Sequence, residues 1–163
     1  AARAGKAIEG TNTEAGGRRA LADAITLAAE SKPALIIDFA TLTGAARVAL
    51  GPQLPAFFAN DEALAAEFAA AADTARDPVW RLPLWPGYRD MLKSGVADMV
   101  NSADGGFAGA ITAALFLEAF VPAGTPWLHL DTFAWNPAAR PGRPKGGEAL
   151  GLRAVWALLN ARF

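Results

Sequence analysis

Glu14 and Arg18 are the two charged side chains in a glycine-rich run at the start of the chain. The run reads Asn-Thr-Glu-Ala-Gly-Gly-Arg at residues 12–18 and leads into a helix-like segment. From residue types alone, Glu14 is expected to be a solvated carboxylate. Arg18 falls in the first turn of the expected helix, where a cation is mildly unfavourable against the helix dipole. This placement favours a special role for Arg18, such as holding an anion.

Three further polar residues lie in expected strands. His129 is the single histidine, and a packed, hydrogen-bonded side chain is favoured for it over a metal ligand. Asp38 and Asp131 stand at strand ends, where α/β proteins place functional groups, but a structural capping role is favoured for each.

The glycines at 105–109 precede an expected helix and can bind phosphate through N–H groups. The absence of a lysine and of a clear preceding strand makes that signal weak.

The hydrophobic pattern predicts helices that alternate with strands. Apolar residues recur at helical spacing over residues 18–31, and Asn60 is expected to cap a second helix. Further helices are expected at residues 87–94, 110–121 and 148–162. The last of these is expected to bury four side chains: Leu152, Val155, Trp156 and Leu159.

Short apolar runs predict the strands. Residues 34–40 are typical of a strand buried on both faces, and residues 127–131 alternate as a strand does. Shorter strands are expected at residues 46–50 and 56–59, with a frayed one near residues 7–9 that has no obvious partner. Residues 137–147 are expected to form a stiff loop. The pattern indicates one α/β domain with a mixed, mostly parallel central sheet.

Composition excludes several classes of protein. The chain has 163 residues, of which 53% are hydrophobic and 19% charged, with a net charge of −1. Lysines and arginines are scattered, so nucleic acid is not an expected partner. Apolar stretches are too short for a membrane span, and no signal core is visible. With no cysteine, disulfides and thiolate metal sites are excluded. We therefore expect a cytoplasmic protein without membrane contact.

The run at residues 12–18 resembles the metal-binding signature of the leucyl aminopeptidases, also called cytosol aminopeptidases or peptidase family M17. That signature reads Asn-Thr-Asp-Ala-Glu-Gly-Arg, and five of its seven positions match. Glu14 stands where the family has Asp, and Gly16 replaces the family's Glu. Other blocks resemble family segments and extend the resemblance over essentially the whole chain: residues 38–45, 80–85, 93–98, 108–114, 127–131 and 141–148.

The resemblance implies roles for particular residues. Glu14 would bind metal and Arg18 would act in catalysis by positioning reacting groups, whereas Gly16 occupies a lost ligand position. Five residues would contact substrate: Asn12, Ala15, Thr41, Leu42 and Gly44. The family uses two divalent ions, Mn²⁺ or Zn²⁺, to activate a shared water, and this chain would hold one or none. Residues 108–114 would form a wall of the specificity pocket.

The resemblance also implies a domain and a function. Residues 1–163 would be a single domain, the C-terminal portion of an α/β/α catalytic domain whose other metal ligands and catalytic lysine lie upstream. The expected activity is a metalloaminopeptidase that hydrolyses N-terminal residues from peptides, as a homo-oligomer that is hexameric in the family. One alternative is a non-catalytic, degenerate member or fragment that serves as a structural or oligomerisation subunit. Another is a module that binds small anions at Arg18.

Overall fold

A central sheet of four strands organises the molecule. The computed structural model describes residues 2–163, with only the backbone of Glu14. The strands are arranged in the order β2-β6-β3-β4. Their bounds are Ile36–Ala40 for β2, Trp127–Asp131 for β6, Ala56–Ala59 for β3 and Trp80–Arg81 for β4. Neighbours β2 and β6 are parallel, β6 and β3 antiparallel, and β3 and β4 parallel. The predicted mixed, mostly parallel sheet is confirmed.

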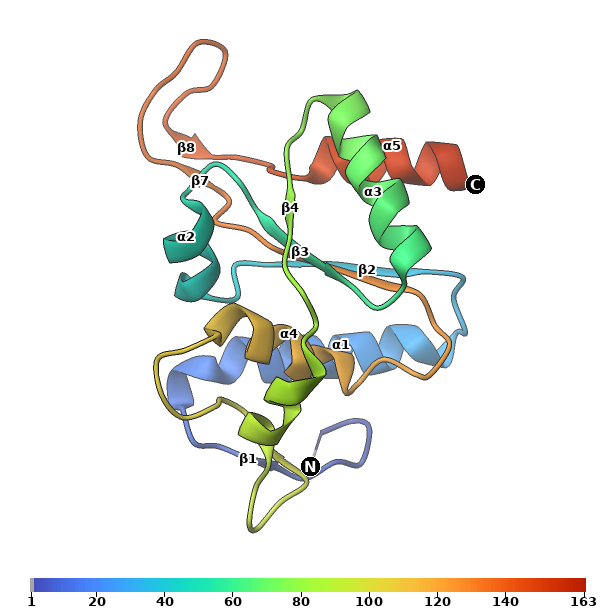
Figure 1. Cartoon of the computed structure of the whole chain (residues 1–163), viewed down its shortest axis with the longest axis vertical. Coiled ribbons are helices and arrows are strands. Elements are labelled where there is room, and N and C mark those ends of the chain that lie inside the picture. Colours follow the sequence, from blue (N-terminus) through green and yellow to red (C-terminus); the bar gives the residue numbers. More distant parts are fainter. Residues whose placement is uncertain (1) are drawn as a thin grey trace.

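Helices cover both faces of this sheet. Figure 1 shows α3 (Glu62–Ala75) and α5 (Leu152–Arg162) above the strands, with α1 (Gly16–Glu30) and α4 (Gly109–Glu118) below. Trp127 packs into a core cluster with α1 and α4, whereas Leu128 and Leu130 pack with α3 and α5. Because β6 lies between two helical layers, all five of its residues are buried. Its alternation of apolar and polar residues therefore does not mark a solvated face.

The edge strand β2 is less buried than its sequence suggests. Ile36 and Asp38 are buried, but Phe39 is 39% exposed. The expectation of a strand buried on both faces is wrong at this residue. Because β2 is an edge strand, only β6 pairs with it in the described part of the chain, and its other side has no neighbouring strand to cover Phe39.

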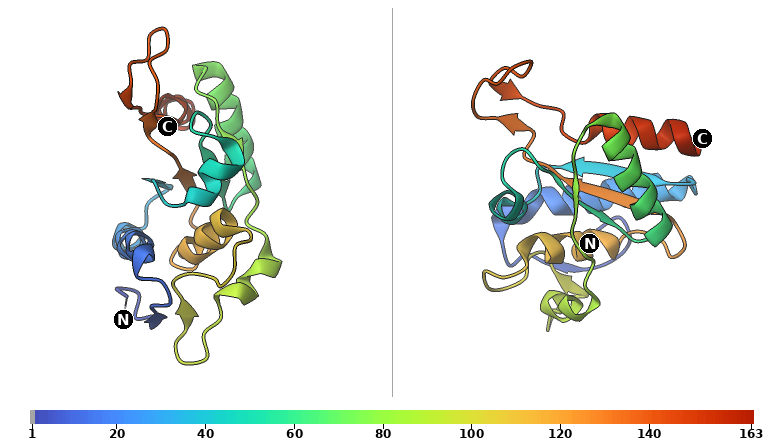
Figure 2. Two further views of the ribbon diagram at one scale, coloured as in Figure 1. Left: turned by 90° about the vertical axis from the view of Figure 1, so that its left-hand side faces the viewer. Right: turned by 45° about the horizontal axis from the view of Figure 1, so that its top comes forward.

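Two small sheets complete the strand set. β1 (Ile8–Glu9) pairs in parallel with β5 (Met99–Val100), which supplies the partner missing from the sequence reading. β7 (Trp135–Asn136) pairs antiparallel with β8 (Gly146–Gly147). Figure 2 shows this β7–β8 hairpin projecting beyond the helical layers.

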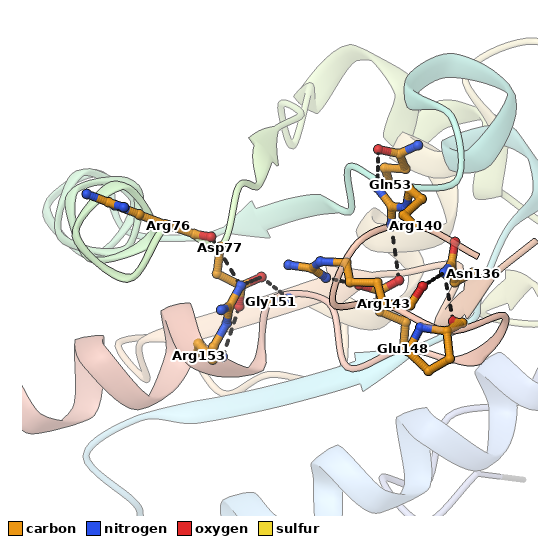
Figure 3. Close-up of polar contacts among 10 residues, drawn as sticks. Gln53, Arg76, Asp77, Asn136, Arg140, Arg143, Glu148, Gly151 and Arg153 are labelled. Atoms are coloured by element: carbon orange, nitrogen blue, oxygen red, sulfur yellow. Dashed lines mark hydrogen bonds and ion pairs between the residues drawn. The ribbon is translucent and has the colours of Figure 1, made fainter. Parts of the chain in front are cut away.

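Charged contacts anchor the β7–β8 hairpin, which occupies the segment expected to be a stiff loop. Arg140 donates to Gln53 Oε1 at 2.6 Å and to Glu148 Oε2 at 3.2 Å. Arg143 forms a second ion pair with Glu148. Figure 3 shows both guanidinium groups gathered around this one carboxylate. The hairpin is thereby held against the loop that carries Gln53.

The segment expected to be a strand at residues 46–50 is a helix instead, α2 (Gly44–Leu50). Thr43 caps it, because its hydroxyl accepts a hydrogen bond from the Ala46 amide at 3.0 Å. Val48 is its single β-branched residue, so little in the sequence opposes a helix. Gly51, at φ 77°, ends it. This cap decides between the two structures.

The start of α3 lies one residue later than expected. Asp61 is its N-cap and accepts a hydrogen bond from the Leu64 amide at 2.7 Å. The Asn60 side chain instead accepts from the Trp127 amide and donates to Thr125. Asn60 thus ties the end of β3 to the start of β6. The remaining expected helices are confirmed with small shifts, including a 3₁₀ helix η2 (Pro86–Leu92).

Helix α5 buries only part of the predicted face, with Leu159 partly buried against the core between α3 and α5. Val155 is buried as expected, but Leu152 is 53% and Trp156 68% exposed. The buried residues are Ala154, Val155 and Leu158. The helix begins at Leu152 because Gly151, at φ 82°, precedes it. In the described residues, no helix is long and apolar enough to cross a membrane.

Asp77, which follows α3 on the same face of the sheet, fixes the start of α5. Its buried carboxylate accepts hydrogen bonds from Gly151, Arg153 and Ala154 at 3.2, 2.9 and 3.1 Å. Figure 3 shows this carboxylate pointing at the first turn of the helix. One side chain therefore satisfies three of the amides that a helix start leaves free.

Replacing Asp77 with Ala should therefore destabilise the fold. Three amides lose their acceptor, and we expect the free energy of unfolding to fall by about 2 kcal/mol. Asp61→Ala removes one acceptor from an exposed cap and should cost about 1 kcal/mol. Urea denaturation followed by circular dichroism measures both. A loss for Asp77→Ala no larger than that for Asp61→Ala would contradict the role of Asp77.

Candidate functional site

The glycine-rich run at residues 12–18 forms the entry to α1. Its middle is a 3₁₀ turn, η1 (Thr13–Ala15), and α1 begins directly at Gly16. The buried Asn101 holds the preceding chain, since its Oδ1 accepts from the amides of Thr11 at 2.9 Å and Asn12 at 3.2 Å. Its Nδ2 donates to the Asn12 carbonyl at 2.6 Å. Asn101 was not among the residues that the sequence pattern singled out.

Arg18 lies inside the protein at the start of α1. Its side chain is largely buried, and Nη1 donates to the Asn101 carbonyl at 2.8 Å. Burial lowers the pKa of the Arg18 guanidinium, and the negative charge of Asp131 opposes that shift. An arginine keeps its charge in proteins, so Arg18 is a buried cation. Its closeness to Asp131 brings the 12–18 run next to the end of β6.

Asp131 organises the loop that follows β2. Its Oδ1 accepts from the amides of Leu42 at 3.0 Å and Thr43 at 3.2 Å, and Oδ2 accepts from the Thr43 hydroxyl at 2.6 Å. The same hydroxyl caps α2. The expected structural role of Asp131 is confirmed. Its carboxylate sets the backbone of the loop at residues 41–44.

The predicted substrate residues thus fall into two groups. Asn12 and Ala15 belong to the 12–18 run, and Thr41, Leu42 and Gly44 belong to the 41–44 loop. Between the groups, burial lowers the pKa of the Arg18 guanidinium and the negative charge of Asp131 raises it through space, without a direct ion pair among the described contacts. Asn12, Thr41 and Gly44 are exposed. Parts of both segments therefore lie at the surface.

A small pocket adjoins the 41–44 loop. It has a volume of about 100 Å³ and a lining that includes Thr41, Gly44, Arg47, Asp131 and Phe133. The Arg47 guanidinium lies over the Phe133 ring, 4.8 Å from its centre. The sequence reading missed both residues, and the one signal for Arg47 was a charge inside an otherwise apolar run that was expected to be a strand.

The metal ligands predicted for this site are not assembled by the described side chains. The side chain of Glu14 lies outside the described residues. Gly16 has no side chain, and a Cβ at its position would meet nothing within 4 Å. Among the side chains that the structure describes, no group of three or more His, Cys, Asp or Glu residues could hold an ion. These residues do not fit a site for two metal ions.

Asp38 and His129 form a buried pair between β2 and β6. His129 Nδ1 lies 2.5 Å from Asp38 Oδ1, and Trp127 Nε1 donates to Asp38 Oδ2 at 2.7 Å. The imidazole is fully buried and stacks on the rings of Trp127 and Phe58. The packed, hydrogen-bonded role expected for His129 is confirmed. The expectation that Asp38 caps a strand end is wrong, because Asp38 lies in the middle of β2 and pairs with β6 instead.

The glycine-rich loop before α4 packs against α2. A Cβ at Gly109 would lie 3.1 Å from Ala45 Cβ, which is tighter than an ordinary contact. Gly109 therefore permits the close approach of α4 to α2. This packing explains the glycine without a phosphate.

Comparison with known proteins decides the family. A sequence model described as the cytosol aminopeptidase family, catalytic domain, matches residues 1–156. The chain belongs to this family. Peptidase M17 chains are aminopeptidases, so the aminopeptidase resemblance of the 12–18 run is confirmed at the level of the family.

Individual relatives agree with this assignment. A probable cytosol aminopeptidase of Roseiflexus castenholzii is 50% identical over 154 residues, which are 93% of this chain and 31% of that protein. The crystal structure of the Coxiella burnetii cytosol aminopeptidase is 57% identical with a TM-score of 0.95, covering 99% of this chain and 35% of that one. The bottromycin maturation enzyme BotP, in complex with Mn, is 40% identical with a TM-score of 0.88, covering 98% and 36%. The chain therefore spans about a third of these proteins.

Asp131→Asn should loosen the 41–44 loop. The neutral amide is a weaker acceptor, places an NH₂ group against the Thr43 hydroxyl, and removes the negative charge near Arg18. We expect amide hydrogen exchange at Leu42 and Thr43 to accelerate about tenfold. Exchange measured by NMR checks this, and Asp61→Asn, which alters the α3 cap instead, should leave both amides at their wild-type rates. Unchanged rates in Asp131→Asn would rule out this role of the carboxylate.

Proposed function

We propose that this chain contributes the substrate-binding side of an aminopeptidase site that removes N-terminal residues from peptides. The observation that carries the proposal is the position of Asp131, whose carboxylate holds the 41–44 loop and lies near Arg18. The family membership supports the reaction class. On this proposal, residues 1–163 are a C-terminal portion of the catalytic domain.

Arg18 is the catalytic residue in this proposal. Asn101 engages one of its five N–H donors, and the others can orient the attacking water or the oxygens of the transition state. A guanidinium held in place by burial needs little rearrangement when charge develops on an oxygen. Burial thus makes Arg18 a better positioned donor than a solvated arginine.

The two segments bind the peptide. Thr41, Leu42 and Gly44 lie along the loop that Asp131 holds. At the entry to α1, Asn12 is exposed and Ala15 is partly buried. The amides of Asn12, Leu42 and Thr43 already donate to Asn101 and Asp131, so in this proposal the peptide contacts the groups of the two segments that these bonds leave free. A fixed loop lowers the ordering cost of binding.

The metal site is incomplete in our proposal. Glu14 is a surviving metal ligand, and Gly16 removes another, so the 163-residue chain binds one ion weakly or none. BotP is described in complex with Mn, which makes Mn²⁺ the first ion to test and Zn²⁺ the second. The described residues support no catalytic step that passes through a metal. We therefore propose that the chain by itself is inactive. In its natural setting we propose a cytoplasmic homo-oligomer, hexameric as in the family, that acts on peptides.

Gly16→Glu should increase Mn²⁺ binding. The new side chain has open space and restores a carboxylate next to Glu14, so we expect about tenfold tighter binding of Mn²⁺, an oxygen-preferring ion. Gly16→Gln, which has the same size without the charge, is the matched control. Isothermal titration measures the affinity, and release of leucine from a chromogenic amide measures activity.

The unmodified chain should show no Mn²⁺-dependent leucine release. Such release would refute the claim that the chain is inactive. Equal Mn²⁺ affinity in Gly16→Glu and Gly16→Gln would refute the lost-ligand interpretation of Gly16.

A second candidate function is that of a structural or oligomerisation subunit. The exposed face of α5 favours it, because Leu152, Trp156 and Phe163 recur at helical spacing and are 53%, 68% and 74% exposed. Exposed apolar stripes of this kind mark contact surfaces.

Replacing Trp156 with Glu would place a charge in that stripe. If the helix associates, we expect Trp156→Glu to shift the sedimentation profile toward monomer, with the exposed Val48→Glu on α2 as the control. Identical profiles for the wild-type and Trp156→Glu chains would remove support for this candidate.

A further inference from the structure

Arg47 is a cation without a charged or hydrogen-bonded partner in the described part of the chain. Other arginines pair with carboxylates, such as Arg81 with Glu62 and Arg89 with Glu118. The contacts of Arg47 are instead the Phe133 ring, 4.8 Å from the guanidinium carbon, and the 41–44 loop. Its charge is therefore available to a ligand.

The direction of the Arg47 side chain places this charge at the predicted substrate loop. Arg47 belongs to the last turn of α2, where a cation usually points toward the final carbonyl groups. Here Nη2 lies 3.8 Å from the position that a Cβ on Gly44 would take. The guanidinium thus turns back along the helix and lies beside Gly44.

The pocket between these groups is suited to a small anion. Its volume is about 100 Å³, enough for a carboxylate and a few water molecules, since a water occupies about 30 Å³ in the liquid. Thr41 and Thr132, two further polar residues, also line it. An apolar substrate side chain would gain little from these groups, whereas a carboxylate can accept two hydrogen bonds from a guanidinium.

The negative charge of Asp131 in the same pocket is already compensated. Its oxygens accept three hydrogen bonds from Leu42 and Thr43, and Arg18 lies near it. Arg47 is the cation in this lining and has no carboxylate partner in the described part of the chain, so it is the group that an anion in the pocket would meet. The Phe133 ring holds the guanidinium in place without neutralising it.

We propose that Arg47, positioned by Phe133, binds a carboxylate of the peptide substrate and gives the site a preference for acidic ligands. This inference rests on the proposed peptide-binding function of the 41–44 loop and names a substrate class for it. The carboxylate can be an acidic side chain at the peptide N-terminus or the free C-terminus of a short peptide. Both sources offer the same bidentate acceptor to the guanidinium.

Isothermal titration of the full 163-residue chain separates the two sources. The first pair of probes is glutamate α-amide and glutamine α-amide, which differ only in the side-chain charge. The second pair is Leu-Gly and Leu-Gly-amide, which differ only in the C-terminal charge. In at least one pair, the acidic probe should bind roughly fivefold or more tightly, as expected for a partly exposed ion pair.

Variants of Arg47 assign the preference. Arg47→Met should lower the affinity ratio to about one, and Arg47→Lys, which keeps the charge without the planar fork, should give an intermediate ratio. Arg76→Met, at the C-cap of α3 and outside the pocket lining, is the control and should keep the wild-type ratio. Circular dichroism confirms that each variant is folded.

Two results would overturn the proposal. One is an affinity ratio below about two for both probe pairs in the wild-type chain. The other is a wild-type ratio that persists in Arg47→Met. The assay measures binding without hydrolysis, so absence of aminopeptidase activity under all metal conditions would count against the proposed function alone. An Arg47-dependent ratio would then still establish the carboxylate site.

Discussion

The buried carboxylate of Asp131 is the constraint on which both segments of the candidate site depend. Removing a carboxylate from water costs several kcal/mol unless it is paired and hydrogen-bonded. Asp131 meets this requirement with two amides and a hydroxyl from the 41–44 loop, and with the nearby charge of Arg18. The loop backbone is therefore positioned by the need to compensate one buried charge, whereas Arg18 is held by its hydrogen bond to the Asn101 carbonyl.

The central strand β6 buries Asp131 because helices cover the strand on both sides. Polar residues on such a strand must find partners inside the protein, and each does so with a different element. His129 pairs with Asp38 on β2, and Asp131 binds the loop that follows the same strand. A strand that carries polar residues into the core thus joins β2, the 41–44 loop and the start of α1 into one unit.

The same architecture separates the substrate-facing groups from the metal-binding ones. The 41–44 loop and Arg18 are anchored by contacts within this chain, so they do not need a metal ion to be held in place. Gly16, which stands at a predicted ligand position, begins α1, and a Cβ there would meet nothing within 4 Å. The order of the 41–44 loop is therefore independent of the predicted ligand positions.

The sequence by itself determined the family, the order of most helices and strands, and the residues of the 12–18 and 41–44 segments. These depend on local patterns, such as the helical spacing of apolar residues over 18–31 and the ordered motif blocks. Tertiary structure decided what local patterns cannot specify. The Thr43 cap of the helix at Gly44–Leu50 is a local signal that the sequence reading missed, whereas the buried face of α5 depends on Asp77 and on packing against α3. The roles of Asn101, Arg47 and Phe133 arise from contacts between residues far apart in the chain, because burial and pairing are properties of the assembled core.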